Sequence, residues 1–408
     1  MSVAPASTAP AEPLNVLFSV RPFRGHLHPL IPLARAFRRA GHNVAIASAE
    51  DVITVVTGAG LPWLPAGSNP WELAQAFPGE DSDYGYPALA AKVADLLEIA
   101  VEQFPPDVII REPTDLAPAV AAEVAGAVSV IYGLGHFIPA KSWRFLKADE
   151  AITALRRDYG LAEDPGLDSL YRQLYLSILP PPFERYRRLP VPAVQRLRYI
   201  PWDGDSAAPA GAAATDAAAT DAAAADGTAE RPTVLVTLGT VYNTHSSLFS
   251  RFLEALATEP VDVICTLGEG ADEAVLAKAP ANVRFERYLP HSSILPRCQA
   301  MLCHAGFNTM LGCLATGTPV VCVPIGSDQE FNARKIAAAG LGLWLRDAEA
   351  SVEQIREAMR RVLTEPSFSA KARAFADGMA HRPGFRAAIS RIEALAAARP
   401  SAEVAPGA

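Results

Sequence analysis

Two short apolar runs, one on each side of an alanine-rich stretch, restrict the fold of this chain. Residues 14–20 read LNVLFSV and residues 233–238 read TVLVTL. Nearly uninterrupted apolar runs of this length, bounded by turn residues, are typical of strands buried on both faces of a parallel sheet. The chain therefore begins the same kind of structure twice.

Helix-like segments alternate with further apolar runs of strand length. After the first run, the segment PLIPLARAFRRAG predicts a helix that ends at Gly41. This alternation predicts an α/β fold with parallel sheets, and two such units in tandem place ligands in a cleft at the carboxyl ends of the strands. The other predicted strands are residues 43–48, 107–110, 128–132, 261–267, 283–285, 300–303 and 319–323.

The stretch from residue 203 to residue 230 consists almost entirely of Ala, Asp, Gly, Thr and Ser. It has too few large apolar side chains to offset the entropy of ordering, although alanine-rich runs can form transient helices. We therefore expect a flexible linker between two Rossmann-like domains, with the last predicted helices (352–363, 369–378 and 386–398) in the second domain. The expected boundaries are 1–13 for a disordered start, 14–202, the linker at 203–231, 232–398, and 399–408 for a disordered tail.

Charge and cysteine content exclude several classes of function. The net charge of −8 argues against nucleic acid as a partner, because phosphate neutralisation needs a basic face. The five cysteines include no CxxC pair, so buried free thiols in a reducing cytoplasm are expected. No apolar run approaches the roughly 20 residues of a membrane span, and the N-terminus lacks the pattern of a signal peptide, so we expect a cytoplasmic protein.

The segment from residue 301 to residue 343 has the pattern of a phosphate and sugar site. A predicted strand is followed by His304, two small residues and a helix, whose first N–H groups can hold phosphate with help from His304 and Thr309. The next strand ends beside Asp328 and Gln329, and a carboxylate with an amide suits a ligand rich in hydroxyl groups.

This segment resembles the donor-binding signature of family 1 glycosyltransferases, which have two facing Rossmann-like domains (the GT-B architecture), and in particular the bacterial enzymes of natural-product and antibiotic (macrolide-type) biosynthesis. Residues 287–291 (RYLPH) also resemble the family's aromatic–x–Pro–Gln element. The residues that match the signature are His304, Ala305, Gly306, Phe307, Asn308 and Thr309, followed by Asp328, Gln329, Asn332 and Ala333.

The resemblance implies roles for several of these residues in binding a sugar nucleotide. Tyr288 would stack on the base and the Leu289 backbone would bind its edge, while Asp328 and Gln329 would bind sugar hydroxyls. The residues implied to lie around the diphosphate are Thr240, His304, Gly306, Asn308 and Thr309, with Gly25 of the first domain also in the donor site.

One residue departs from the family pattern. Gly312 stands where many members have a Glu that grips the ribose hydroxyls. Deoxyribose lacks the 2′-hydroxyl, so this departure favours a thymidine diphosphate donor over a uridine diphosphate donor.

The loop after the first predicted strand, RPFRGHLHP, resembles the family's Gly–His–x–x–Pro element, in which the histidine is the catalytic base. His26 would take the proton of the acceptor hydroxyl, a task that suits a neutral imidazole with a pKa near 6.5. A carboxylate should orient its ring. Glu112 occupies the usual position of that carboxylate, normally Asp, and Asp115 is the alternative.

Together these features predict an inverting glycosyltransferase that moves a sugar from a nucleoside diphosphate to a hydroxyl of a small apolar aglycone. No metal and no cofactor are expected. In the family, segments such as the aromatic-rich ones at 63–86 and 136–186 shape the acceptor pocket, and the alternative is that these aromatics are ordinary core residues. The alternatives are a nucleotide-sugar epimerase or hydrolase of the same architecture, and a catalytically silent helper protein. The sequence is compatible with a homodimer but does not decide it.

Overall fold

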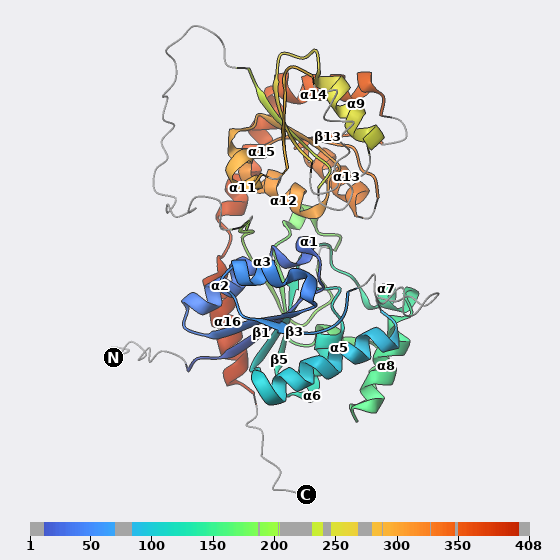
Figure 1. The fold of residues 1–408 in the computed structure, drawn as a ribbon, viewed down its shortest axis with the longest axis vertical. Helices are drawn as coiled ribbons and strands as arrows, with labels where there is room; N and C mark the ends of the chain where they lie inside the picture. The colour runs from blue at the N-terminus through green and yellow to red at the C-terminus, as the bar shows by residue number, and fades with distance from the viewer. Residues whose placement is uncertain are drawn as a thin grey trace, which may run out of the picture. The chain divides into compact units, whose positions relative to one another are not determined.

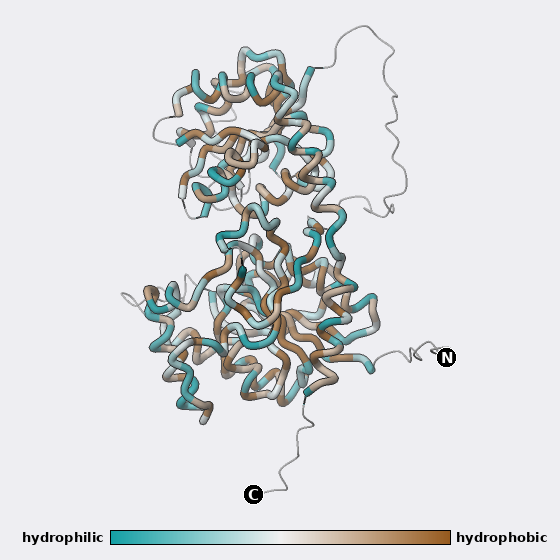
Figure 2. Tube along the Cα trace, turned by 180° about the vertical axis from the view of Figure 1, so that it is seen from behind, coloured by the Kyte–Doolittle hydropathy of each residue, from teal (hydrophilic) through white to brown (hydrophobic). Residues whose placement is uncertain are grey.

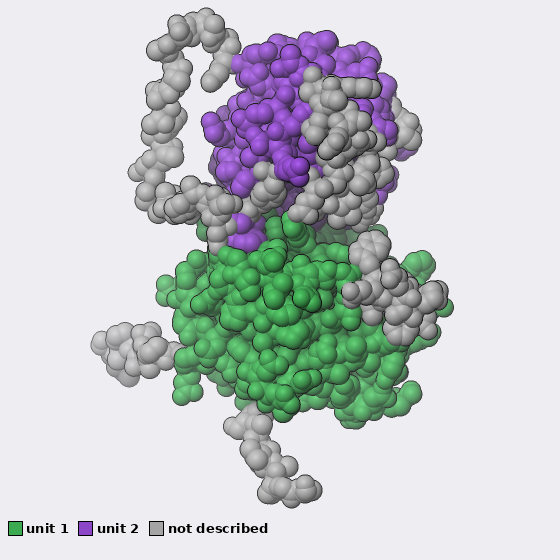
Figure 3. Space-filling model, viewed as in Figure 1, with its two compact units in different colours: residues 1–179, 184–200, 382–408 green, residues 180–183, 201–381 purple. Residues whose placement is uncertain are grey.

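The computed structural model describes residues 12–69, 84–186, 188–202, 204, 231–239, 246–267, 280–287, 289–326, 328–346 and 350–399. They form two compact units (Figure 3): unit 1 takes residues 1–179, 184–200 and 382–408, and unit 2 takes residues 180–183 and 201–381. Most of the predicted linker, together with residues 1–11 and 400–408, lies outside the described residues.

Unit 1 contains a parallel seven-stranded sheet (Figure 1) in the order β3-β2-β1-β4-β5-β6-β7. Its first six strands follow the 3-2-1-4-5-6 order of dinucleotide-binding folds. The strands are β1 (Asn15–Ser19), β2 (Asn43–Ser48), β3 (Trp63–Pro65), β4 (Val108–Arg111), β5 (Val128–Gly133), β6 (Leu174–Ser177) and β7 (Val194–Arg196).

Helices cover both faces of this sheet, because successive side chains of a strand point to opposite faces. On β1, Phe18 packs edge-on against Phe37 of α2, whereas Leu17 packs in a cluster with Leu96 of α5. Figure 2 shows the apolar residues concentrated along the strands.

The helices of unit 1 are α1 (Arg24–Leu27), α2 (Ile31–Arg39), α3 (Ile53–Gly58), α5 (Tyr86–Glu98), α6 (Ala117–Val124), α7 (Ala140–Phe145), α8 (Ala148–Asp158) and α16 (Phe385–Ala397), with short turns η1 (Glu50–Val52), η2 (Ile99–Gln103) and η3 (Asp168–Tyr171).

Unit 2 repeats the same topology with a parallel six-stranded sheet in the order β10-β9-β8-β11-β12-β13. Its strands are β8 (Thr233–Thr237), β9 (Asp262–Thr266), β10 (Val283–Glu286), β11 (Ala300–Cys303), β12 (Val320–Cys322) and β13 (Gly342–Trp344). Its helices are α9 (Ser246–Leu256), α11 (His291–Ile294), α12 (Phe307–Thr316), α13 (Gln329–Ala339), α14 (Val352–Thr364) and α15 (Pro366–Ala380), with η4 (Pro181–Phe183) and η5 (Leu295–Arg297).

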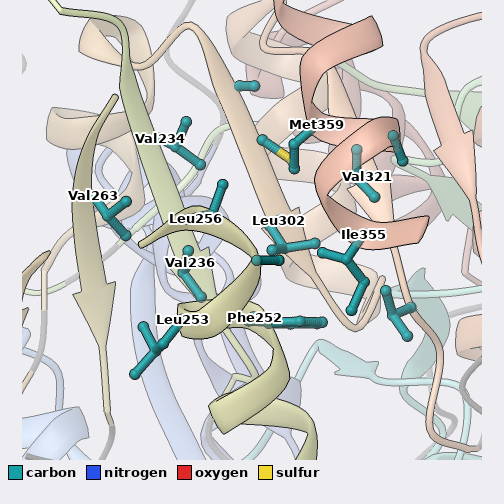
Figure 4. Close-up of a cluster of buried hydrophobic side chains, with 14 of the residues drawn as sticks. Val234, Val236, Phe252, Leu253, Leu256, Val263, Leu302, Val321, Ile355 and Met359 are labelled. Carbon is teal, nitrogen blue, oxygen red and sulfur yellow. The ribbon is translucent and has the colours of Figure 1, made fainter. Parts of the chain in front are cut away.

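The core of unit 2 lies between the sheet and helices α9 and α14 (Figure 4). Val234 and Val236 of β8 lie in one cluster with Phe252 of α9 and with Ile355 and Met359 of α14. These side chains are buried, which stabilises each by about 1.5–3 kcal/mol relative to exposure. The strands whose carboxyl ends carry the loops described below are therefore held by a buried apolar core.

Each predicted strand is confirmed, and one predicted helix belongs to the other unit. Helix α16 packs against α2 of unit 1, and Arg399 just after it donates to Asp107, at 2.9 Å to the carbonyl and 2.5 Å to Oδ1. The prediction that this last helix packs in the second domain is therefore wrong. An amphipathic pattern predicts a helix, but it does not say which sheet the helix covers.

No described helix is long and apolar enough to cross a membrane.

Candidate active site

His26 lies on α1, the single helical turn that follows β1 at the carboxyl edge of the unit 1 sheet. Its backbone N–H donates to the carbonyl of Phe23 at 2.9 Å, and the two rings lie with their centroids 5.3 Å apart. About a third of the His26 side chain is exposed (32%). The imidazole is thus held by a short turn and remains accessible to a ligand.

Glu112 follows β4 and lies against His26. Its side chain is 1% exposed, and its Oε1 is 3.1 Å from Nδ1 of His26. Thr114 donates to the same carboxylate twice, from its backbone N–H and from its hydroxyl, each at 2.6 Å. Burial by itself raises the pKa of Glu112, but the His26 charge and the hydrogen bonds from His26 and Thr114 outweigh burial and lower the pKa to about 2. Glu112 is therefore ionised at neutral pH.

The ionised carboxylate determines which tautomer His26 adopts. A carboxylate can only accept hydrogen bonds, so Nδ1 of His26 carries the hydrogen and donates it to Glu112. In the neutral ring, Nε2 is then the nitrogen with a lone pair for a proton. This arrangement is that of a general base oriented by a carboxylate.

Asp115 does not take the place of Glu112 beside His26. It is 3% exposed and accepts from Lys92 Nζ at 2.7 Å and from Ser19 Oγ at 2.7 Å. The alternative in which Asp115 contacts His26 is therefore not the arrangement in this structure. The carboxylate of Asp115 instead compensates a buried lysine, which also donates to the carbonyl of Val20 at 3.2 Å.

Arg111 organises the turn that carries both carboxylates, a role that the sequence did not predict. Its guanidinium is buried (1% exposed) and donates to three carbonyls of that turn, those of residues 112, 113 and 115, at 3.1–3.3 Å. It also donates to the carbonyl of Leu170 at 2.5 Å. A polar residue at the last position of a buried strand, next to Glu and Pro, was the signal that could have identified it.

In unit 2, His304 follows β11 and is enclosed by two glycines. A Cβ atom at Gly306 would lie 2.4 Å from Nε2 of His304, and one at Gly239 would lie 2.8 Å from its Cε1. A side chain at either position would therefore displace the His304 ring or the loop that carries it. Burial of His304 (5% exposed) lowers its pKa to about 4, although a hydrogen bond to the Thr237 backbone opposes the shift. His304 is therefore a neutral side chain at pH 7.

Helix α12 begins directly after this histidine. Gly306 stands at the N-cap and has no side chain to cap the helix. Asn308 and Thr309 lie in the first turn. The first N–H groups of a helix and its positive dipole end attract anions. The structure therefore places His304, Gly306, Asn308 and Thr309 at one helix N-terminus, and their contact with a diphosphate remains a prediction.

Helix α13 begins at the edge of the neighbouring strand, β12, with Asp328 at its N-cap position. The Asp328 side chain makes no capping bond and instead accepts from Asn332 Nδ2 at 2.9 Å. Gln329 is only 2% exposed, and its amide oxygen accepts from the N–H groups of Ile325 at 2.8 Å and Gly326 at 3.1 Å. The amide oxygen of Gln329 thus holds its own loop, whereas the predicted contact of Gln329 with sugar remains a prediction.

The structure describes some of the remaining predicted residues but not all of them. Gly25 is exposed on α1 next to His26, and Leu289 is half-buried before α11. At Gly312, on α12, a Cβ would lie 3.0 Å from Leu295 Cδ1. Thr240 and Tyr288 lie outside the described residues. Within the described ranges, no group of three or more His, Cys, Asp or Glu side chains is arranged to hold a metal ion.

Comparison with known proteins relates this chain to sugar transferases. Residues 250–395 match the family model of the erythromycin biosynthesis protein CIII-like C-terminal domain. The elloramycin glycosyltransferase ElmGT of Streptomyces olivaceus is 30% identical over 397 residues, covering 91% of this chain and 94% of that protein. The 10-deoxymethynolide desosaminyltransferase of Streptomyces venezuelae is 27% identical over 435 residues, covering 94% and 97%.

Solved structures agree with this relationship. The glycosyltransferase SnogD from Streptomyces nogalater has a TM-score of 0.74 at 25% identity, covering 94% of this chain and 100% of that one. The spinosyn forosaminyltransferase SpnP has a TM-score of 0.75, also at 25% identity, covering 94% and 99%. The chain therefore belongs to the glycosyltransferases of antibiotic biosynthesis, and it is an enzyme with their two-domain GT-B fold.

Proposed function

We propose that this glycosyltransferase moves a deoxysugar from thymidine diphosphate to a hydroxyl of a small apolar natural-product aglycone, with inversion at the anomeric carbon and with His26 as the base. The observation that carries the proposal is the 3.1 Å contact between Nδ1 of His26 and the buried, ionised Glu112. That contact leaves Nε2 to take the proton of the acceptor hydroxyl while the hydroxyl oxygen attacks the sugar.

The leaving group would be held by unit 2. The departing diphosphate develops negative charge as the anomeric bond breaks, and the start of α12 supplies N–H groups and a positive dipole end for that charge. His304 stands directly before this helix and, being neutral, adds no negative charge beside the diphosphate. Asp328 would accept hydrogen bonds from sugar hydroxyls.

Two considerations support a thymidine nucleotide as the donor. Gly312 offers no carboxylate to the 2′-hydroxyl of a ribose. Among the structural neighbours, glycosyltransferase VinC was solved in complex with dTDP, and the spinosyn rhamnosyltransferase SpnG was solved with thymidine diphosphate. Calorimetric titration with thymidine diphosphate and with uridine diphosphate tests the donor class. Tighter binding of the thymidine form supports the proposal, and tighter binding of the uridine form contradicts it.

The role of His26 is tested by comparing two kinds of acceptor with His26→Ala. An aliphatic alcohol must lose its proton during attack, so its rate should fall by roughly 10²–10⁴-fold. A nitrophenol that is already ionised at the assay pH needs no base, so its rate should change little. Equal losses for both acceptors would contradict the assignment of His26 as the base. Binding of neither nucleotide by the unaltered enzyme would favour a silent helper protein instead.

A further inference from the structure

Asn332 is buried in unit 2 and has no role in the transfer reaction described so far. It lies one turn into α13, and its exposed fraction is 0%. Its side-chain amide nitrogen donates to the carbonyl of Ala305 at 3.0 Å and to Oδ2 of Asp328 at 2.9 Å. A single NH₂ group therefore connects the loop after β11 with the start of α13.

Ala305 has a backbone conformation that alanine disfavours. Its φ is +65°, in the left-handed region, where the Cβ of an L-residue approaches its own carbonyl oxygen. Glycine adopts this conformation without the steric cost. The Ala305 N–H lies 3.4 Å from Sγ of Cys303, and its carbonyl is held by Asn332. These two contacts maintain the turn that places His304 on one side of Ala305 and the first turn of α12 on the other.

Asp328 receives the second hydrogen bond. Because Oδ2 accepts from Asn332, the carboxylate has a fixed orientation, and the side chain does not cap the helix behind it. The Asn332 backbone N–H also donates to the Asp328 carbonyl at 3.0 Å. One buried amide thus holds the residue proposed to bind sugar and the turn proposed to bind diphosphate.

We propose that Asn332 is a positioning residue of the donor site. It keeps Ala305 in its left-handed conformation and sets the orientation of Asp328, so that the diphosphate-binding turn and the sugar-binding carboxylate keep one relative arrangement. This inference rests on the proposed function for its ligand, a nucleoside diphosphate sugar. Its structural part, the coupling between Asn332 and Ala305, can be tested without any ligand.

The ligand test uses thymidine diphosphate, which contains the diphosphate and lacks the sugar. Asn332→Ala should weaken its binding by about tenfold, the ordinary effect of misplacing one hydrogen-bonding group. Ala305→Gly alone supplies the reference affinity for the double variant. The double variant should recover most of the lost affinity, because glycine keeps the left-handed turn without Asn332. Failure of Ala305→Gly to restore binding would overturn the proposal.

Asn282 provides a matched control in the same unit. Its amide nitrogen also donates to two backbone carbonyls, those of Leu256 at 2.9 Å and Val261 at 3.0 Å, in loops away from α12 and α13. Asn282→Ala should lower the melting temperature and leave nucleotide affinity unchanged. If it weakens nucleotide binding as much as Asn332→Ala does, the effect is general destabilisation and the proposal fails.

Urea unfolding of the same variants separates this inference from the proposed function. Ala305→Gly must stabilise the Asn332→Ala protein more than it stabilises the unaltered protein, because only the former lacks the support for a left-handed alanine. Equal effects in both backgrounds would overturn the coupling, whether or not any nucleotide binds. Asn332→Ser keeps the site polar and serves if Asn332→Ala does not fold. If coupling is present but neither thymidine nor uridine diphosphate binds, the proposed function fails and the coupling stands.

Discussion

The two units share one strand order, yet the polar groups at the carboxyl edges of their sheets differ in kind. In unit 1 these groups are buried charges: Glu112 beside His26, Asp115 paired with Lys92, and the Arg111 guanidinium beneath them. In unit 2 His304 is neutral, and the amides of Gln329 and Asn332 bond to backbone groups. The same scaffold thus supports two different electrostatic environments.

The difference follows from the two tasks proposed for the units. A base that takes a proton becomes charged, so it needs a fixed opposite charge nearby, and unit 1 buries Glu112 for that purpose. An anionic diphosphate needs donors that are already oriented, which the N–H groups at the start of α12 provide, and the neutral His304 adds no competing charge. Each prediction below changes the character of one of these two edges.

The largest effect is expected from Glu112→Gln, which removes the fixed charge of unit 1. The amide can donate to Nδ1 of His26 and so favour the wrong tautomer, and it cannot stabilise the imidazolium. Transfer to an aliphatic alcohol should fall on the order of 10³-fold, with thymidine diphosphate affinity unchanged. Initial rates and calorimetry check this. Asp115→Asn is the control, and a similar rate loss in that variant would show that any buried charge matters equally.

The pH dependence of the free energy of unfolding should also differ between the polar groups of the two sheets. The folded pKa of Glu112 is depressed, to about 2 from an unfolded value of 4.5, so its contribution is fully present above pH 4.5 and is lost as the pH falls toward 2. Across that interval the unaltered protein should lose roughly 3 kcal/mol more than Glu112→Gln. Urea unfolding at several pH values measures this difference. A gap that does not change with pH would contradict the depressed pKa.

His304 should titrate in a different and higher interval. Its folded pKa is about 4 and its unfolded value is 6.5, so between these values the unfolded chain binds more protons and stability rises with pH. Relative to His304→Asn, the unaltered protein should gain about 3 kcal/mol as the pH rises from 4 to 6.5. Urea unfolding of both proteins at several pH values measures this gain. A difference between the unaltered protein and His304→Asn that does not change with pH would contradict a buried neutral His304.

Arg111→Lys should reduce both stability and rate, with a smaller effect than loss of the carboxylate. The lysine ammonium cannot replace the planar guanidinium, which donates both to carbonyls of the 112–115 turn and to the carbonyl of Leu170. We therefore expect a loss of about 2–3 kcal/mol in the free energy of unfolding. Arg156 is similarly buried (3% exposed), bonds the carbonyl of Ala162 and pairs with Glu123. Arg156→Lys should lose comparable stability and keep its turnover rate. Equal loss of turnover in both variants would remove any specific role for Arg111.

The smallest effect is expected in unit 2 from Gly312→Glu, which restores the carboxylate of many family members. The ratio of uridine to thymidine diphosphate affinity should rise by about tenfold, the value of one charge-assisted hydrogen bond. Leu295 must move to admit the new side chain, so Gly312→Ala controls for packing alone. An unchanged ratio in calorimetry would contradict the argument that Gly312 favours thymidine.

Local patterns predicted much of the fold. The buried strands β1, β2 and β11 are nearly continuous apolar runs, and their predicted bounds agree with the structure within one residue at each end. Four strands were not predicted: β3, β7 and β13, which are three residues long and only partly buried, and β6, which is four residues long and buried. A short strand is stabilised by hydrogen bonds to a neighbouring strand. The local sequence does not show which strand that neighbour is.

The sequence by itself determined the type of each unit and the loops that carry the polar groups, because apolar periodicity and glycine positions depend only on neighbouring residues. The tertiary structure decided which partner each side chain meets. Glu112 and Asp115 lie three residues apart after one strand, and only the packing of α5 gives Lys92 to Asp115 and leaves Glu112 for His26. Likewise, α16 returns to unit 1 through contacts such as Arg399 with Asp107, 292 residues away in the chain. Burial and hydrogen-bond satisfaction are properties of the whole packed unit, so contacts of this kind follow from the fold and not from spacing.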